Sequence, residues 1–305
     1  MTDPIQVICE NTGAAIEVPM GTTLLDVQRR LMPACDHPCL AAYVNNRTKE
    51  LNYRIYTPVT VRFLDITSFE GIRVYQRTVS FVLQKAVQEL WPDRRLHIRH
   101  SMGSNGFYCE VSGIDEFTDG QIDRLRDHML KLVGRDLPIR RTKALTEQVR
   151  SLYAAYGFED KIALLDTRPR LYSELYTIDG MPGYFYGSLA PSTGYVGLFD
   201  LQRYYNGFYI ALPLRSDPSR LNRTIHQEKM FDIFQEYQSW VRIMGVPTVG
   251  QLNSKVLGGD ASELIKIAEA FHEKKIASVA DAVYDANVAR GARVVLILSL
   301  IHISE

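Results

Sequence analysis

Hydrophobic and polar positions alternate with short periods over the first segment of the chain, residues 5–66. Apolar strands flank one helix at 21–31, and the inner face of that helix carries Leu24, Leu25, Val27 and Leu31. Thr22 or Thr23 is expected to cap the helix, and Asn45–Asn46 suits a tight hairpin turn. The order strand, strand, helix, strand, strand predicts a small α+β grasp around the helix.

Helical spacing dominates the second segment, residues 70 to about 215. One apolar stripe predicts a helix that stops at Trp91-Pro92; its members are Val79, Val82, Leu83, Ala86, Val87 and Leu90. Thr118 and Gln121 form the pattern of a capping box for the next helix. A further helix is expected to end at Gly157.

The third segment, residues 222–290, is helical in pattern. Thr224 and Gln227 are expected to cap a helix that Gly245 stops, and two more short helices should follow around 258–283. After Gly291, the apolar and β-branched run that begins at Val294 is typical of a buried strand.

Composition narrows the class of protein. The 305 residues are 46% hydrophobic and 23% charged, which is typical of a globular chain of two or three domains. Lys and Arg number 35, as do Asp and Glu, so the whole chain is not expected to attract nucleic acid or an anionic membrane. These totals do not exclude a local basic patch. Four cysteines and the lack of a long apolar run indicate a reducing, cytoplasmic setting without a membrane.

One short motif, "CDHPC", invites a metal interpretation. Cys35 and Cys39 flank His37, but a structural zinc site usually takes four ligands as two short-spaced pairs, and no second pair lies nearby. A turn is favoured, and no metal site is assigned.

Two modules resemble parts of threonyl-tRNA synthetases. "EVPMGTTLLDV", "AAYVNN" and "TVRFLD", in this order, resemble a TGS domain, a ubiquitin-like module found at the front of those enzymes. "VLQKAVQELWPDRRLHI" followed by "SNGFYCEV" is similar to their second additional domain. The resemblance implies a TGS domain at 1–67, the synthetase-like α+β domain at 68–221 and a helical connector at 222–291.

The resemblance also locates a degenerate editing site. In synthetases this second domain hydrolyses mischarged tRNA with a His-x-x-x-His pair on its first helix and a later Cys and His. Here the matching positions hold Arg77, Phe81, Tyr205 and Tyr209. These side chains do not replace imidazole or thiolate ligands, nor a general base at neutral pH, so no catalytic residue is assigned. The four remain a candidate ligand cleft, because an aromatic ring beside an arginine suits a base or an anionic group. A solvated helix face is the alternative.

The C-terminal order implies a further resemblance. A connector with "AEAFHEKKIASVAD" before "RVVLI" resembles the front half of bacterial uridine kinase-like nucleoside kinases, where this strand leads into a Walker A loop. Residues 292–305 are then the first strand of a missing α/β kinase domain plus a non-native tail, since "LSLIHISE" resembles a translated sequencing adapter. A real apolar C-terminal strand is the alternative.

Three functions follow as expectations. The first is the regulatory or substrate-sensing part of an ATP-dependent uridine kinase, inactive by itself and without a cofactor, while ATP and Mg²⁺ are implied for the full-length parent. Its partners would be the missing kinase domain and RNA or a nucleotide. The second is a stand-alone RNA- or tRNA-binding protein built from synthetase-derived modules, without editing activity. The third is an assembly device without a ligand.

Overall fold

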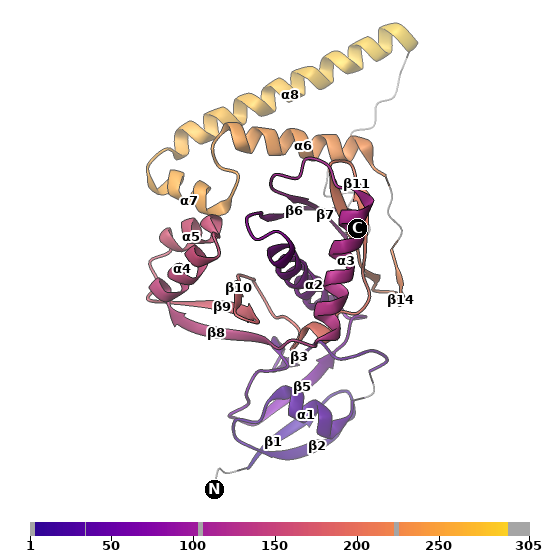
Figure 1. Ribbon diagram of the computed structural model, residues 1–305, viewed down its shortest axis with the longest axis vertical. Helices are drawn as coiled ribbons and strands as arrows, with labels where there is room; N and C mark the ends of the chain where they lie inside the picture. Colours follow the sequence, from indigo (N-terminus) through magenta and orange to yellow (C-terminus); the bar gives the residue numbers. More distant parts are fainter. Residues whose placement is uncertain (1–3, 34, 103–105, 223–225, 292–305) are drawn as a thin grey trace. The chain divides into compact units, whose positions relative to one another are not determined.

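The computed structural model describes residues 4–33, 35–102, 106–222 and 226–291. Within them the fold is mixed α+β, with several sheets and helices (Figure 1). Two compact units can be separated along the chain: the first holds residues up to 143 and again from 174 to 222, and the second holds 144–173 and 226–291.

Five strands and one helix open the first unit. They are β1 (Pro4–Cys9), β2 (Ala15–Pro19), α1 (Leu24–Leu31), β3 (Ala41–Val44), β4 (Arg47–Glu50) and β5 (Val59–Leu64). The strand order is β2-β1-β5-β3-β4; β1 runs parallel to β5 and the other neighbours are antiparallel. Alternate β1 side chains point inward, and Leu24 and Val27 of α1 join the same buried core.

Local sequence explains where these elements begin and turn. The Thr23 hydroxyl accepts a hydrogen bond from the Asp26 backbone N–H at 3.1 Å, which caps α1 as predicted. Asn45 and Asn46 have φ values of 47° and 62°. Two central residues with positive φ make the hairpin turn whose twist matches antiparallel strands, so the hairpin between β3 and β4 is confirmed.

A long helix, α2 (Phe69–Leu90), is buried along most of its length in the rest of the first unit (Figure 1). A four-stranded sheet has the order β11-β12-β7-β6, with β6 (Leu96–Met102), β7 (Gly106–Val111), β11 (Asp200–Tyr204) and β12 (Gly207–Ala211). Helix α3 (Asp119–Gly134) begins with the predicted capping box of Thr118 and Gln121. The short elements are η1 (Thr193–Tyr195), β13 (Pro213–Leu214) and β14 (Asp217–Leu221).

A third sheet was not predicted. Its order is β10-β9-β8, with β8 (Ile139–Leu145), β9 (Tyr172–Ile178) and β10 (Met181–Gly183), so β8 is an edge strand. Ile139 is the only buried residue of β8, and the next four are exposed. Because "RRTK" has no apolar alternation and β9 lies far along the chain, hydrophobic periodicity gives no signal here.

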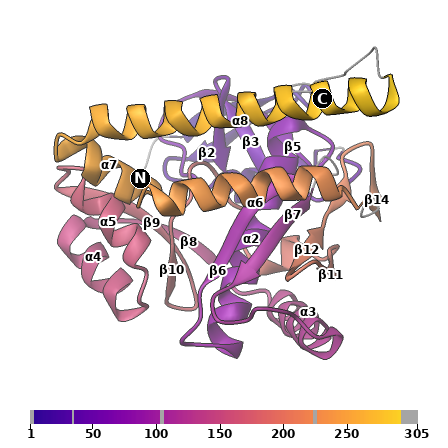
Figure 2. The ribbon, with the colours of Figure 1, turned by 90° about the horizontal axis from the view of Figure 1, so that it is seen from above.

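The second unit is helical. It contains α4 (Thr146–Ala155), α5 (Glu159–Asp166), α6 (Glu228–Ile243), α7 (Val249–Leu257) and α8 (Ala261–Arg290). Helices α6 and α8 lie side by side (Figure 2), where the Trp240 and Phe271 rings stack with centroids 5.2 Å apart. Glu236 pairs with Lys275 at 2.5 Å across the same two helices.

Several helix boundaries test the predictions for this region. Gly157 follows α4 with a φ of 64°, as expected. Gln227 is the residue before α6 and not a residue within its first turn, and Thr224 lies outside the described residues. The expectation of two short helices around 258–283 was wrong, since a single helix of 30 residues, α8, covers this stretch. No Gly or Pro interrupts 261–290, so nothing in the sequence stops the helix.

The predicted strand that begins at Val294, like all of 292–305, lies outside the described residues. In the part of the chain that the structure describes, no helix combines the length and the apolar character needed to cross a membrane.

Candidate functional site

Arg77 and Phe81, the predicted cleft residues on α2, have different surroundings. Phe81 is completely buried, and its ring lies 5.0 Å from that of Phe185. Arg77 is partly buried, donates from Nη1 to the Ser188 carbonyl oxygen at 3.1 Å, and has a pKa lowered mainly by desolvation. Arg77 therefore supports the loop at Gly187–Ser188, and Phe81 belongs to the core.

Tyr205 and Tyr209 lie on the four-stranded sheet. Tyr209 is completely buried in β12, whereas Tyr205 occupies the turn before β12 with a φ of 48° and is 38% exposed. Tyr204 contacts both rings, at centroid distances of 4.8 and 6.3 Å. None of the four predicted residues lines either of the two cavities described below, and ligand binding by them stays a prediction.

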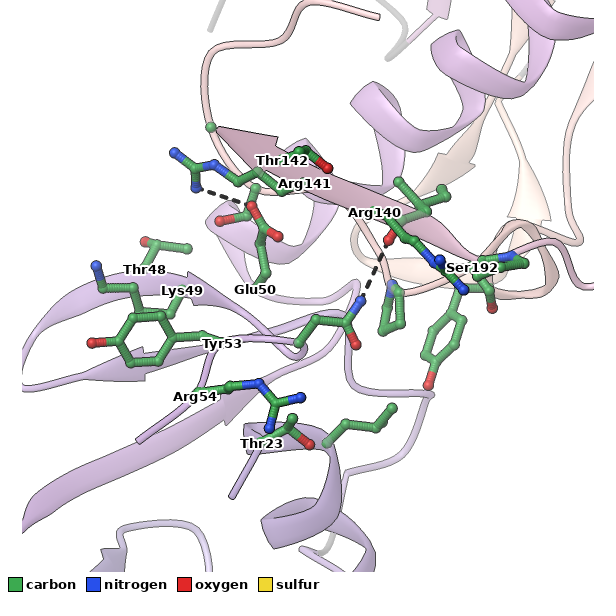
Figure 3. Close-up of a pocket in the computed structure, with 18 of the residues that line it drawn as sticks. Thr23, Thr48, Lys49, Glu50, Tyr53, Arg54, Arg140, Arg141, Thr142 and Ser192 are labelled. Atoms are coloured by element: carbon green, nitrogen blue, oxygen red, sulfur yellow. Dashed lines mark hydrogen bonds and ion pairs between the residues drawn. The ribbon is translucent and has the colours of Figure 1, made fainter. Parts of the chain in front are cut away.

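A groove of about 1210 Å³ in the first unit is the strongest candidate site, and sequence reasoning missed it. One wall comes from α1, β4 and the segment after β4, and the other from β8, β9 and the loop before η1 (Figure 3). Three acidic side chains line it, against six basic ones: Arg29, Lys49, Arg54, Arg140, Arg141 and Lys143.

The first wall presents cations beside an aromatic ring. The Lys49 ammonium lies 4.8 Å from the centre of the Tyr53 ring, a cation–π contact. Arg54 donates from Nη1 to the Gly21 carbonyl oxygen at 2.8 Å. This hydrogen bond holds the guanidinium of Arg54 against the wall. Figure 3 shows Lys49, Tyr53 and Arg54 together on this side of the groove.

The second wall includes the exposed edge strand β8. Arg140 is exposed and has no ion-pair partner among the described residues. Arg141 instead donates to Glu50 at 3.0 Å and to Glu174 at 2.5 Å. Burial alone would lower the pKa of Arg141, but these carboxylates outweigh it and raise the pKa. The Tyr176 hydroxyl contacts the same Glu50 carboxylate, so Arg141 acts as a clamp between β4, β8 and β9.

Asp136 lines the groove. It has a φ of 48°, an uncommon backbone conformation for a residue other than glycine. Its Oδ1 accepts from the Gly194 backbone N–H at 3.0 Å and from the Ser192 hydroxyl. The Thr193 hydroxyl donates to the Leu132 carbonyl oxygen at 2.7 Å. These contacts hold η1 against the end of α3, beside the groove.

A second cavity, of about 650 Å³, shares Asp136 and Tyr195 with the groove. His37 and Pro38, from the segment before β3, line it, and much of the remaining lining is apolar or proline. Among the described residues, no group of three or more His, Cys, Asp or Glu is placed to hold a metal ion.

Exposed guanidinium and ammonium groups attract phosphates, and tyrosine faces stack on bases. The basic run "RRTK" was the one sequence signal that could have pointed here. By itself such a run is found on many solvated surfaces.

No family model matches this chain. Curated relatives do match, and those compared are threonine–tRNA ligases. The Rubrobacter xylanophilus enzyme is 28% identical over 190 residues, which cover 62% of this chain and 29% of the relative. The Desulforamulus reducens enzyme is 27% identical over 157 residues, covering 52% and 25%, and threonine–tRNA ligase 1 of Bacillus subtilis is 26% identical over 204 residues, covering 66% and 31%. The matched part of the chain thus spans less than a third of each relative's length.

These matches support a threonyl-tRNA synthetase-like region and contradict the prediction of a nucleoside kinase. That prediction, with its implied ATP and Mg²⁺, depended on the helical connector and on a short apolar run beginning at Val294. Apolar runs of this length occur in many buried strands and identify no fold by themselves, and these residues lie outside the described part of the chain. Synthetase likeness is therefore the interpretation that stands.

Proposed function

We propose that this chain is an RNA-binding protein built from threonyl-tRNA synthetase-like modules, that its ligand is tRNA, and that it does not hydrolyse aminoacyl-tRNA. The observation that carries the proposal is the groove between β4 and β8, with its six basic side chains. The relatives named above act on tRNA, as their name states, and this supports the choice of ligand.

The finer domain assignment is part of the proposal. Residues 1–67 are a TGS-type β-grasp module; the strand order β2-β1-β5-β3-β4 and the helix α1, which fall within 4–64, support this. Residues 68–221 correspond to the editing-like domain of synthetases, and the length of sequence matched to the relatives supports that assignment.

Phosphate recognition follows from the geometry of the groove. Arg140 on one wall and Lys49 on the other are cations without an acidic partner among the described residues, so binding a phosphate breaks no existing ion pair. Tyr53 offers a ring face, partly covered by Lys49, that suits an unpaired base. A polyanion gains affinity here chiefly by releasing its counterions, so binding should weaken steeply with salt.

The absence of editing follows from the chemistry at the four aligned positions. A catalytic site would need groups that hold a metal or take a proton near neutral pH. Arg77, Phe81, Tyr205 and Tyr209 supply neither, and the complete burial of Phe81 and Tyr209 excludes water from two of the four.

The experiment is a titration of labelled tRNA with the full chain, repeated at several salt concentrations. We expect binding whose logarithmic affinity falls by about 0.7–0.9 per phosphate contacted for each tenfold rise in salt. In parallel, mischarged tRNA incubated with the chain should lose its amino acid no faster than in buffer. Binding that is undetectable or insensitive to salt would refute the RNA proposal, and accelerated deacylation would refute the lack of editing.

A further inference from the structure

The "CDHPC" turn holds two thiols that the groove does not use. The Sγ atoms of Cys35 and Cys39 lie 3.0 Å apart, with the Cys39 thiol donating to Cys35. Cys39 is 2% exposed and packs in the core of the N-terminal sheet, while Cys35 is partly exposed and packs against that core. Two sulfur atoms at this separation need only a small side-chain rotation to reach bonding distance.

We propose that Cys35 and Cys39 form a reversible disulfide, in which Cys35 attacks first and Cys39 resolves, with a small disulfide such as oxidised glutathione as the oxidant. The Cys35 thiolate attacks one glutathione sulfur, which forms a mixed disulfide and releases one glutathione thiolate. The Cys39 thiolate then attacks Cys35 Sγ and releases the second glutathione. The protein loses two protons and two electrons, and the oxidant is reduced to two thiols.

The order of attack follows from the surroundings of the two thiols. Burial raises the pKa of both, but the hydrogen bond from Cys39 lowers that of Cys35, whereas the same bond raises that of Cys39. Cys35 is also the more exposed of the two, so it is the sulfur that an oxidant reaches. The first attack is slow at neutral pH, because little of either thiol is ionised.

The other two cysteines serve as internal references. Cys9 and Cys109 are completely buried, and their Sγ atoms lie 3.8 Å from the Asn11 Oδ1 and 3.9 Å from the Phe107 carbonyl oxygen. Burial keeps an oxidant from reaching either thiol in the folded protein. Both should therefore remain thiols under conditions that oxidise Cys35 and Cys39.

The modification would lie beside both cavities. His37 and Pro38, inside the five-residue turn, line the second cavity. Tyr195, which lines both cavities, packs against the core that contains Cys39. Closing the disulfide therefore restrains one wall of the second cavity. The proposal stands independently of RNA binding.

The test is mass mapping of the folded full chain after equilibration with mixtures of reduced and oxidised glutathione. After quenching and alkylation, trypsin releases residues 31–47 as one peptide that contains both cysteines. In oxidising mixtures we expect this peptide to lose two hydrogen masses and to escape alkylation, while Cys9 and Cys109 stay alkylatable. A peptide that remains doubly alkylated throughout, or a disulfide that includes Cys9 or Cys109, would overturn the pair.

Two variants test the order of attack. Cys39→Ser should accumulate a stable glutathione adduct on Cys35, because no resolving thiol remains. Cys35→Ser should gain no adduct on the buried Cys39 over the same period. The reverse pattern would overturn the assigned roles. Repeating the oxidation in guanidinium should let glutathione reach Cys9 and Cys109 as well, so that part of each escapes alkylation; if both stay fully alkylatable there, burial is not what protects them in the folded protein.

Discussion

Removing one cation from each wall of the groove is the sharpest test of how RNA is held. The double variant Lys49→Ala/Arg140→Ala changes two side chains that make no ion pair among the described residues, so the fold should lose little. Arg141 is left in place, because it clamps Glu50 and Glu174 and its loss would disturb the walls themselves.

The expected loss of tRNA affinity follows from how exposed the two side chains are. Arg140 is exposed and Lys49 is half-buried, so each phosphate contact contributes about 0.5–1 kcal/mol. Together they amount to about 1–2 kcal/mol, or roughly a 5- to 30-fold loss of tRNA affinity. Two fewer phosphate contacts should also reduce the slope of log affinity against log salt by about 1.4–1.8.

The assay is fluorescence anisotropy of labelled tRNA at four or more salt concentrations. A matched control, Arg124→Ala/Lys131→Ala, removes the same charge from exposed positions of α3 that do not line the groove. The control should keep the wild-type slope. If both double variants weaken binding equally, or if the groove variant keeps the full slope, the tRNA is held by overall charge or elsewhere, and the groove assignment fails.

Three further predictions concern stability. Arg141→Ala should lower the free energy of unfolding by about 1–3 kcal/mol in urea titrations. The reason is that the Glu50 carboxylate, which is 12% exposed, loses its cation. An unchanged free energy of unfolding would mean that the clamp does not stabilise the fold. Gly207→Ala should destabilise by at least about 1–3 kcal/mol, because the new Cβ would lie 2.2 Å from a β7 carbonyl oxygen, whereas Gly120→Ala meets no atom within 4 Å and should be neutral or stabilising. Burial lowers the pKa of His100 to about 4. As the pH falls, the unfolded chain therefore takes up this proton before the folded chain does, so the free energy of unfolding should fall between about pH 6.5 and pH 4. A His100→Phe variant that loses as much stability over this pH range as the wild type would contradict the prediction.

Sequence alone predicted the elements whose signals are local. The cap at Thr23, the capping box at Thr118 and the hairpin at Asn45–Asn46 each depend on residues within four positions of one another, and each is present. Strand β8 was not predicted, because its partner β9 is distant in the sequence and most of its own residues are polar or charged. Caps and turns can be predicted from residues that are close in the sequence, whereas the pairing of two strands that are far apart in the sequence cannot.

The candidate site shows the same division. Aligned positions drew attention to Phe81 and Tyr209, but sequence periodicity does not separate an aromatic residue in a ligand cleft from one in the core, and both are fully buried. The groove was missed because Lys49 and Arg140 are about ninety residues apart and meet only in the folded chain. Cys35 and Cys39 were visible as a motif, although the 3.0 Å separation of their sulfur atoms could come only from the structure.

The edge position of β8 has a consequence for self-association. An open strand edge offers unpaired backbone groups to another copy of the chain, and proteins commonly guard such edges with charge. Arg140 and Lys143 place positive charge along this edge, so two copies should repel each other where they would otherwise form a continuous sheet. The same cations proposed to hold RNA thus protect the chain from aggregation, and substitutions that replace them with apolar residues should form sheet-rich aggregates at high protein concentration.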